Sequence, residues 1–427
     1  MGTASSARFS PPAHGQDLAG PTKPLKRKLK ALVVFGSIPL FGAEKGNLEA
    51  LRELSQHGIE PVFLTNKKYG HLFIETELDR LGFRYHKAAF GPRIQKGLSL
   101  WGIYLLFWGM FATSFALWRA CRKEKPDFLY LMNPLYAFYV WPALKLLRQP
   151  AVYRLGDEPA VHNFLYRWLW GSLQRRLKKV VVISDFIGRS AEACGFKPAQ
   201  IRRIYNVAPD SLGNGEAKSG ELRLTLRKIV GDQPSDHQET FHREDGVFHL
   251  LYIGQIAEHK GVQLAVDACL KLAREGRKLR LLIAGDPRSG LAVSIAKQIA
   301  EKKAEDVVRI LGFVRNAKDL WQVVDLHLFP SIWEEPLGNS VVEAKAAGIP
   351  SVIFKRGGTQ ELVKDGVDGR NLTDESSEAL AGAIEGYMDD PDLVRAHGRA
   401  AKESAENEFS RARFVKAWLE TIDEVMA

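Results

Sequence analysis

Two glutamates in the C-terminal part of the chain have a spacing that could do chemistry. The segment "WEEPLGNSVVEAKAAGIP" places Glu335 eight positions before Glu343. The preceding apolar run "LHLFPS" predicts a strand, and the residues after Gly338 predict a helix that begins near Asn339. The free N–H groups of a helix start favour a phosphate, and a carboxylate can bind the hydroxyls of a ribose. The segment is therefore a candidate nucleotide site.

The same segment also has a purely structural interpretation. Ser340 and Glu343 are spaced as a capping box, S-x-x-E, which would place Glu343 in the first helical turn without any ligand. The following text, "GIPSVIFKRGGTQELVKDGVDG", predicts another strand, a Gly-Gly loop and a second acidic residue, Glu361, at a helix start. Two glycine-bearing turns in succession favour a ligand cleft, but both interpretations remain open.

The elements that must position these residues alternate along the chain. Before residue 210 the apolar runs include "KALVVFG", "EPVFLTN" and "KKVVVISDF". After residue 246 they include "VFHLLYIG", "LRLLIAGD" and "PSVIFKR". Amphipathic segments typical of helices lie between the runs. This alternation is typical of crossover units and parallel sheets. It predicts an α/β fold with two doubly wound, Rossmann-like domains, whose ligands bind at the carboxyl ends of the strands.

Composition divides the 427 residues into segments. Stretches rich in Ser, Pro, Gly or Asp predict tails and linkers, because they cannot bury enough apolar surface. We predict a disordered tail (1–29), a first domain (30–210), a linker or surface insertion (211–246), a second domain (247–408) and a C-terminal helix that returns to the first domain (409–427).

Charge and cysteine content narrow the class of partner. The net charge of +10 suits an anionic partner, but no zinc-finger or RNA-recognition signature accompanies it, so we predict no nucleic acid. Cys121, Cys194 and Cys269 are scattered, which indicates a reducing cytoplasm and neither structural zinc nor disulfides. The string Asp390-Pro391-Asp392 matches D-x-D only between helices, where a turn explains it. We therefore predict a cytoplasmic protein with no metal and no cofactor.

Several segments of the chain resemble glycosyltransferase family 4. The segments that resemble its C-terminal half are "HLLYIGQIAEHKGVQLAVDA", "LLIAGD", "VRILGF", "LFPSIWEEPLGNSVVEAKAAGIPSVIF" and "GGTQELVKDGVDG". In the first half the similar segments are "GSIPLFGAEKGNLEALRELSQHGIEPVFLTN" and "VVVISDFIGRSAEACGF". Members are retaining GT-B enzymes that use nucleotide sugars. The resemblance implies a GT-B fold in which two Rossmann-like domains face a cleft.

The resemblance also implies roles for individual residues. Glu335 would contact the donor sugar, Glu343 the ribose, and Lys260, in "HKG", would bring positive charge to the diphosphate. Gly42 would lie where the N-terminal loop meets the ligand. Backbone donors to the diphosphate would come from three consecutive residues, Gly338, Asn339 and Ser340. Without the resemblance, Lys260 fits an exposed loop lysine equally well, and Gly42 fits an ordinary turn glycine equally well.

Two positions depart from the family pattern. Gln255 follows the glycine of "YIG", where the family usually has an arginine, so stabilisation of the leaving group depends more on Lys260 and the helix start. The text "RLGDEPAVHNF" places Asp157 near the position of a frequent family histidine. Arg154 and Asp157 are therefore candidate site residues, whereas His162 lies further on and is not one.

The implied reaction is transfer of a sugar from a nucleoside diphosphate sugar to an acceptor, with retention, by a hexosyltransferase-type enzyme. The candidate catalytic residues are Glu335, Lys260 and Asp157. Two alternatives share the fold: a nucleotide-sugar epimerase or phosphorylase, and a non-catalytic nucleotide-sugar-binding subunit, which Gln255 would suit.

A run of 21 uncharged residues from Leu98 to Trp118 reaches the ~20 that cross a bilayer. Its aromatic residues recur every three or four positions and would share one helical face: Trp101, Tyr104, Trp108, Phe111, Phe115 and Trp118. Smaller residues lie largely off that face and could pack on a sheet: Gly102, Gly109, Thr113 and Ala116. Cations flank the run: Arg93, Lys96, Arg119, Arg122, Lys123 and Lys125.

Three interpretations of this run remain open: a membrane span, a buried helix and an interfacial helix. A span would put the strands "EPVFLTN" and "PDFLYLMNP" on opposite sides of the membrane. We favour the interfacial helix, which implies a peripheral protein on the cytoplasmic leaflet and a lipid-linked or membrane-surface glycan as acceptor.

Overall fold

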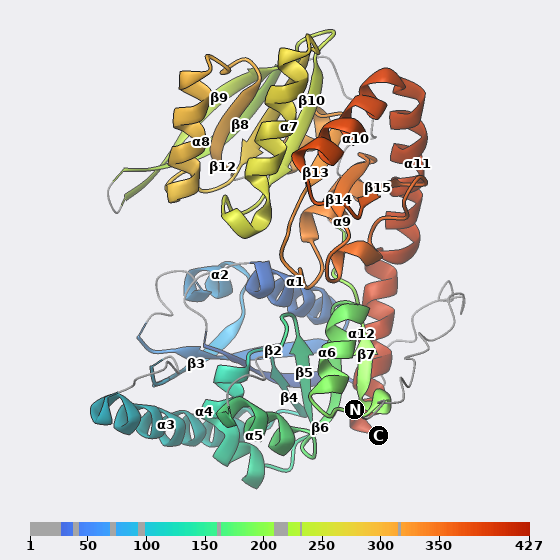
Figure 1. Cartoon of the computed structure of the whole chain (residues 1–427). Coiled ribbons are helices and arrows are strands. Elements are labelled where there is room, and N and C mark those ends of the chain that lie inside the picture. The colour runs from blue at the N-terminus through green and yellow to red at the C-terminus, as the bar shows by residue number, and fades with distance from the viewer. Residues whose placement is uncertain are drawn as a thin grey trace, which may run out of the picture. The chain divides into compact units, whose positions relative to one another are not determined.

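The structure is a computed structural model in which two compact units are described separately (Figure 1). The described residues are 27–36, 42–68, 74–92, 99–159, 164–208, 221–230, 233–314 and 317–427. The first unit comprises Met1–Asn206 with Arg411–Ala427, and the second comprises Val207–Ser410. Most of the expected tail lies outside the described residues, and its last residue, Leu29, already belongs to the first strand.

A parallel sheet of seven strands, in the order β3-β2-β1-β4-β5-β6-β7, forms the centre of the first unit. The strands are β1 (Leu29–Phe35), β2 (Ile59–Asn66), β3 (Arg84–Ala88), β4 (Phe128–Leu131), β5 (Ala151–Leu155), β6 (Leu177–Val182) and β7 (Ile201–Arg203). The central strands read as continuous apolar runs because helices cover both faces of the sheet.

The helices of the first unit form layers on the sheet (Figure 1). They are α1 (Gly42–Gln56), α2 (Ile74–Arg80), α3 (Leu100–Glu124), α4 (Pro134–Leu146), α5 (Phe164–Leu173), α6 (Asp185–Ala193) and α12 (Arg411–Met426), with a 3-10 turn η2 (Pro198–Gln200). Helix α12 belongs to this unit because Trp418 is buried against Tyr130 and Glu420 pairs with Arg202 at 2.8 Å.

The exposed face of α3 is aromatic, as the sequence predicts. The exposed side chains include Trp101, Tyr104, Trp108, Phe111 and Phe115. The small residues Gly109 and Thr113 are buried on the inner side of the helix, which packs against α4 and against strand β3 of the sheet. Thr113 Oγ1 donates to the Ala89 carbonyl at 3.0 Å, and the neighbouring Ser114 Oγ donates to the Tyr139 carbonyl at 3.1 Å. Only 33% of the apolar window of α3 is buried, so the interpretation as an ordinary buried helix is wrong.

By length and composition, α3 is the one helix in the described part of the chain that could cross a membrane. The sheet contradicts a span. Strand β1 pairs with β2, which precedes α3, and also with β4, which follows it. A helix that crossed the bilayer would separate strands that are hydrogen-bonded within one sheet.

The second unit is built on an eight-stranded sheet in the order β15-β14-β13-β10-β11-β12-β8-β9. The strands are β8 (Glu221–Val230), β9 (Gln233–His242), β10 (Phe248–Ile253), β11 (Leu279–Ala284), β12 (Val308–Val314), β13 (Leu326–Phe329), β14 (Ser351–Phe354) and β15 (Gly369–Leu372). The two parallel-sheet units confirm the predicted fold class.

Most of the segment predicted as a linker or surface insertion, 211–246, forms strands rather than an irregular linker. Strands β8 and β9 form an antiparallel hairpin, and β8 joins the sheet through antiparallel pairing with β12. Leu222, Leu224 and Leu226 alternate with polar residues, which is a strand pattern. The strands were not predicted because the segment as a whole is polar in composition.

Helices and turns of the second unit connect these strands. They are η3 (Glu258–Lys260), α7 (Val262–Arg274), α8 (Gly290–Glu301), η4 (Ala317–Gln322), α9 (Asn339–Ala346), η5 (Thr359–Glu361), α10 (Ser377–Asp389) and α11 (Pro391–Glu408). Asp390 caps α11, because its carboxylate accepts from the backbone N–H groups of Asp392 at 3.0 Å and Leu393 at 3.1 Å. The D-x-D string is thus a helix cap.

Candidate functional site

Three neighbouring strands of the second unit bring the candidate residues to one edge of the sheet. Strands β10, β13 and β14 are adjacent and parallel, so their carboxyl ends lie together. The loop after β10 carries Lys260, the loop after β13 carries Glu335 and leads to α9, and the loop after β14 carries Gly357. This is the edge at which open α/β sheets bind ligands.

Lys260 and Glu335 form a partly buried ion pair across two of these loops. The Lys260 Nζ donates to Glu335 Oε1 at 2.6 Å, although the residues are 75 positions apart. The Ser331 hydroxyl donates to the same oxygen at 2.7 Å. Glu335 is only 7% exposed, so these two bonds compensate a carboxylate largely removed from water. Both bonds from described residues use Oε1, which leaves Oε2 to accept from a ligand.

Glycines let the loops approach closely enough to hold this pair. Gly261 has φ +65° and Gly357 has φ +49°, in the left-handed region that favours glycine. A Cβ on Gly261 would clash with the Pro330 carbonyl, and a Cβ on Gly357 would clash with the backbone of Glu335. Sequence reasoning noted the Gly-Gly loop that contains Gly357 but gave it no contact with Glu335, and it missed Gly261, although "HKG" contains that glycine.

The backbone of the Glu335 loop is held by the loop after β14. The Gly358 N–H donates to the Glu335 carbonyl at 2.7 Å, and the Gly357 N–H donates to the Glu334 carboxylate at 2.7 Å. Arg356 binds Glu375 and Glu334, and these hydrogen bonds raise its pKa. Arg356 is a cation that sequence reasoning also missed, but acidic partners already engage it.

The start of α9 presents two hydroxyls beside its first N–H groups. Gly338 is the N-cap with φ +99°, and a Cβ there would lie 3.3 Å from Thr359 Oγ1. The hydroxyls of Ser340 and Thr359 are buried without a hydrogen-bond partner among the described residues. Buried hydroxyls are normally satisfied, so this pair points to a polar ligand. The exposed Asn339 is the first helical residue.

The capping-box interpretation is wrong. A capping box requires Ser340 at the N-cap, but the structure places Gly338 there and Ser340 second in the helix. Glu343 is consequently the fifth helical residue, just beyond the first turn, and it is half-buried.

Gln255 lies in the loop after β10 with an exposed side chain. Its backbone carbonyl accepts a hydrogen bond from the Tyr252 hydroxyl at 2.7 Å. Burial, together with the nearby charge of Glu335, raises the pKa of Tyr252, so the phenol stays neutral and remains a donor. Tyr252 therefore holds the Gln255 backbone in place.

The remaining candidates lie in the first unit. Gly42 begins α1, and Asp157 is exposed in the turn after β5. Arg154, on β5, is only 2% exposed, and it donates to the Gly46 carbonyl at 2.6 Å and to the Asn206 side chain at 2.5 Å. The protein itself uses this guanidinium to hold α1. Donor binding by Arg154 stays a prediction. His162 lies outside the described residues.

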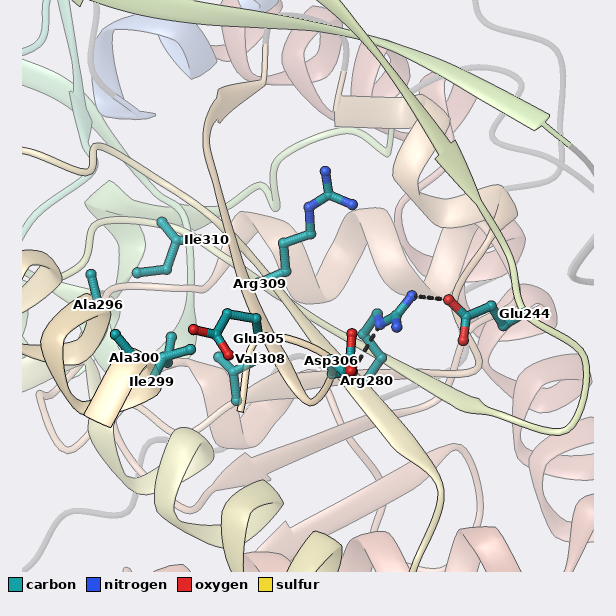
Figure 2. A pocket seen from close by; sticks show the side chains of 10 residues that line it. All are labelled: Glu244, Arg280, Ala296, Ile299, Ala300, Glu305, Asp306, Val308, Arg309 and Ile310. Atoms are coloured by element: carbon teal, nitrogen blue, oxygen red, sulfur yellow. Dashed lines mark hydrogen bonds and ion pairs between the residues drawn. The ribbon is translucent and has the colours of Figure 1, made fainter. Parts of the chain in front are cut away.

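A hollow of about 510 Å³ lies elsewhere in the second unit (Figure 2). Its lining includes Arg280, near the amino end of β11, and Arg309, at the amino end of β12. Arg280 pairs with Glu244 at 2.6 Å, as Figure 2 shows. Because the strands are parallel, this hollow is at the opposite edge of the sheet from Lys260 and Glu335.

Within the described ranges, no group of three or more His, Cys, Asp or Glu side chains could hold a metal ion. The three cysteines are free, and burial raises the pKa of Cys121 to about 12.

Two family models match the chain. The model described as "Glycosyl transferases group 1" matches residues 232–404, and the model described as "Glycosyl transferase 4-like domain" matches residues 41–207. The first match contains the Lys260–Glu335 pair and α9. The second contains most of the first sheet.

Several curated proteins are similar to the chain. Alpha-D-kanosaminyltransferase of Streptomyces kanamyceticus is 25% identical over 271 residues, which cover 60% of this chain and 66% of that protein. The 2-deoxystreptamine glucosyltransferase of the same organism is 27% identical over 235 residues, which cover 55% of this chain and 58% of that protein. The chain thus spans less than two thirds of these relatives. The lipopolysaccharide core biosynthesis glycosyltransferase LpsE of Rhizobium meliloti is 28% identical over 301 residues, which cover 70% of this chain and 77% of that protein.

Solved structures share the fold. A glycosyltransferase from Rickettsia africae superposes with a TM-score of 0.74 at 18% identity, covering 93% of this chain and 98% of that chain. Anabaena HepE in complex with UDP and glucose gives a TM-score of 0.70 at 19% identity, covering 92% and 99%. The two family models match in consecutive order along the chain, and the likeness of fold extends over both units. The chain therefore belongs to the GT-B glycosyltransferases of the family 4 type.

Proposed function

We propose that the protein transfers a sugar from a nucleoside diphosphate donor to an acceptor with retention, as a hexosyltransferase-type enzyme. The observation that carries this proposal is the Lys260–Glu335 ion pair, at the same sheet edge as the two unsatisfied hydroxyls of Ser340 and Thr359. A cation, a buried carboxylate and free hydrogen-bond donors are the groups that a sugar diphosphate requires. The family membership supports the donor class.

The residues have separate tasks in this reaction. The N–H groups of α9 and the hydroxyls of Ser340 and Thr359 bind the diphosphate, and Glu335 Oε2 accepts from a hydroxyl of the donor sugar. As the sugar acquires oxocarbenium character, negative charge grows on the departing diphosphate. The ammonium of Lys260 is then shared between Glu335 and the diphosphate, and one such interaction can lower the barrier by ~3 kcal/mol. No step requires a metal ion.

Acceptor dependence tests the reaction type. The purified protein is incubated with UDP, GDP and ADP sugars, with and without candidate acceptors, and released nucleoside diphosphate is measured. Release that requires the acceptor supports transfer. Release without any acceptor would indicate an epimerase or phosphorylase instead, and binding without turnover for every donor would indicate a non-catalytic subunit.

The role of Glu343 gives a prediction for nucleotide affinity. Glu343→Gln is expected to weaken nucleoside diphosphate binding roughly five- to tenfold, because a carboxylate accepts hydroxyl hydrogen bonds more strongly than an amide does. Isothermal titration calorimetry measures the change. The matched control is Glu378→Gln, an exposed glutamate in the first turn of α10. Unchanged affinity with a lowered melting temperature would show that Glu343 is structural.

The exposed aromatic face of α3 supports a peripheral position on the cytoplasmic leaflet and a lipid-linked or membrane-surface glycan as acceptor. Tryptophan and phenylalanine side chains of an interfacial helix insert at the level of the headgroups. The cations Arg119, Arg122 and Lys123 near the end of the helix would meet anionic lipid. The Rhizobium relative named for lipopolysaccharide core biosynthesis is consistent with such an acceptor.

Liposome flotation tests this position. Wild-type protein is expected to float with anionic liposomes at low salt, and the triple variant Trp101→Ser, Trp108→Ser and Phe115→Ser is expected to stay largely in the soluble fraction. The control is Val293→Ser, in the second unit, where the valine is 61% exposed and thus as exposed as Phe115. Wild-type protein that remains soluble would favour a soluble acceptor.

A further inference from the structure

A hollow of about 450 Å³ lies between α4 and α5 of the first unit. Its lining consists of Trp141, Lys145, Trp168, Gly171, Ser172 and Arg175. The Trp141 indole N–H donates to Ser172 Oγ at 2.6 Å, and the rings of Trp141 and Trp168 lie 4.7 Å apart. These contacts give the hollow a defined aromatic wall.

Two cations line the hollow beside this wall, and none of the lining residues that the structure describes is a carboxylate. The Lys145 Nζ lies 4.9 Å from the centre of the Trp141 ring, and Arg175 is exposed two residues beyond α5. A Cβ on Gly171 would meet nothing within 4 Å, so there is space for a ligand beside the rings. The hollow therefore offers two indoles, a hydroxyl and two positive charges.

The surrounding helices share this charge pattern. Helices α3, α4 and α5 contain a single acidic residue, Glu124, which is buried and bonded to Lys30 and His86. Cations in or just after these helices are Arg119, Arg122, Lys123, Lys125, Lys145, Arg148, Arg167 and Arg175. The layer is thus basic and has no exposed carboxylate on its helices.

The hollow belongs to the same layer as the aromatic face of α3. Helix α4 packs against both α3 and α5, and Figure 1 shows the three helices together on one side of the sheet. Leu146, at the end of α4, and Trp168, on α5, are also exposed. Exposed apolar side chains thus occur on all three helices of the layer.

We propose that this hollow binds the phosphate headgroup of an anionic membrane phospholipid. Indoles concentrate at the headgroup level of a bilayer, and lysine and arginine beside them bind lipid phosphates. The absence of carboxylates from the lining favours an anion, and the neighbouring apolar surface favours an anion that is attached to a bilayer. The inference rests on the proposed membrane docking and adds a specific lipid contact to it.

The test uses the full chain and two exposed cations. Lys145→Gln with Arg175→Gln is compared with Lys297→Gln with Arg395→Gln, which removes the same charge from exposed positions of the second unit. Binding is measured by sedimentation with vesicles of phosphatidylcholine alone and with one-fifth phosphatidylglycerol. On the anionic vesicles we expect binding by the first variant to fall roughly 10- to 30-fold, and binding by the control to fall less than about threefold. On neutral vesicles both variants should bind as the wild type does.

A second variant, Trp168→Ser, keeps every charge and should also weaken binding to anionic vesicles. Equal binding by wild type and both hollow variants, together with loss of binding in the α3 triple variant, would overturn the headgroup site while membrane docking stands. Failure of wild type to bind any vesicle would overturn the docking itself. Tight binding of a soluble, phosphorylated glycan that the Lys145→Gln, Arg175→Gln variant abolishes would reassign the hollow to an acidic glycan.

Discussion

Lys260→Ala is expected to slow sugar transfer by about 100- to 1,000-fold with every donor. The ammonium is the cation that the structure places beside Glu335, and in the proposed reaction it offsets the charge that grows on the leaving diphosphate. Its removal also leaves the buried Glu335 carboxylate with only the Ser331 hydroxyl, which we expect to cost on the order of 2 kcal/mol of unfolding free energy. Initial rates and thermal unfolding measure the two effects.

Two further variants separate catalysis from stability. Lys260→Ala combined with Glu335→Gln should recover most of the lost stability, because no buried charge is left unpaired, but it should not recover transfer. Lys260→Gln keeps a donor for Glu335 without the charge and should transfer as slowly as Lys260→Ala. A Lys260→Gln enzyme with wild-type rates would remove the charge from the mechanism. Lys297→Ala, at an exposed position on α8, is the control.

Gly357→Ala is expected to reduce transfer by about 100-fold, although the residue carries no functional group. The added Cβ would clash with the backbone of Glu335, and φ +49° is unfavourable for alanine. The Glu335 loop must shift to relieve this clash, and a displacement of roughly 1 Å in a reacting group can cost ~100-fold in rate. Activity and the melting temperature are measured together.

The control for this substitution is Gly382→Ala in α10, where a Cβ would meet nothing within 4 Å. Alanine is the better helix former, so this variant should keep full activity and gain up to about 1 kcal/mol of stability. If Gly357→Ala also retained full activity, the geometry of the Glu335 loop would not limit transfer.

Regularly repeated features could be predicted from the sequence because they depend on local periodicity. The alternation of apolar runs and amphipathic segments predicted two parallel α/β units, and both are present. The helix that begins at Asn339 and the exposed aromatic face of α3 followed from spacing alone. The hairpin of β8 and β9 was not predicted, because the polar composition of the segment as a whole is typical of a linker, although its leucines alternate as in a strand.

The tertiary structure alone decided which residues meet. Lys260 and Glu335 are 75 positions apart and meet only because β10 and β13 are neighbours in the sheet, an order that no local pattern encodes. Arg154 on β5 donates to the backbone of α1, and only the fold brings these two elements together. Gly338 rather than Ser340 became the N-cap of α9, because Gly338 adopts a positive φ and lies against Thr359. Periodicity thus determined the elements and their exposed faces, whereas the strand order and the close approach of three loops determined the site.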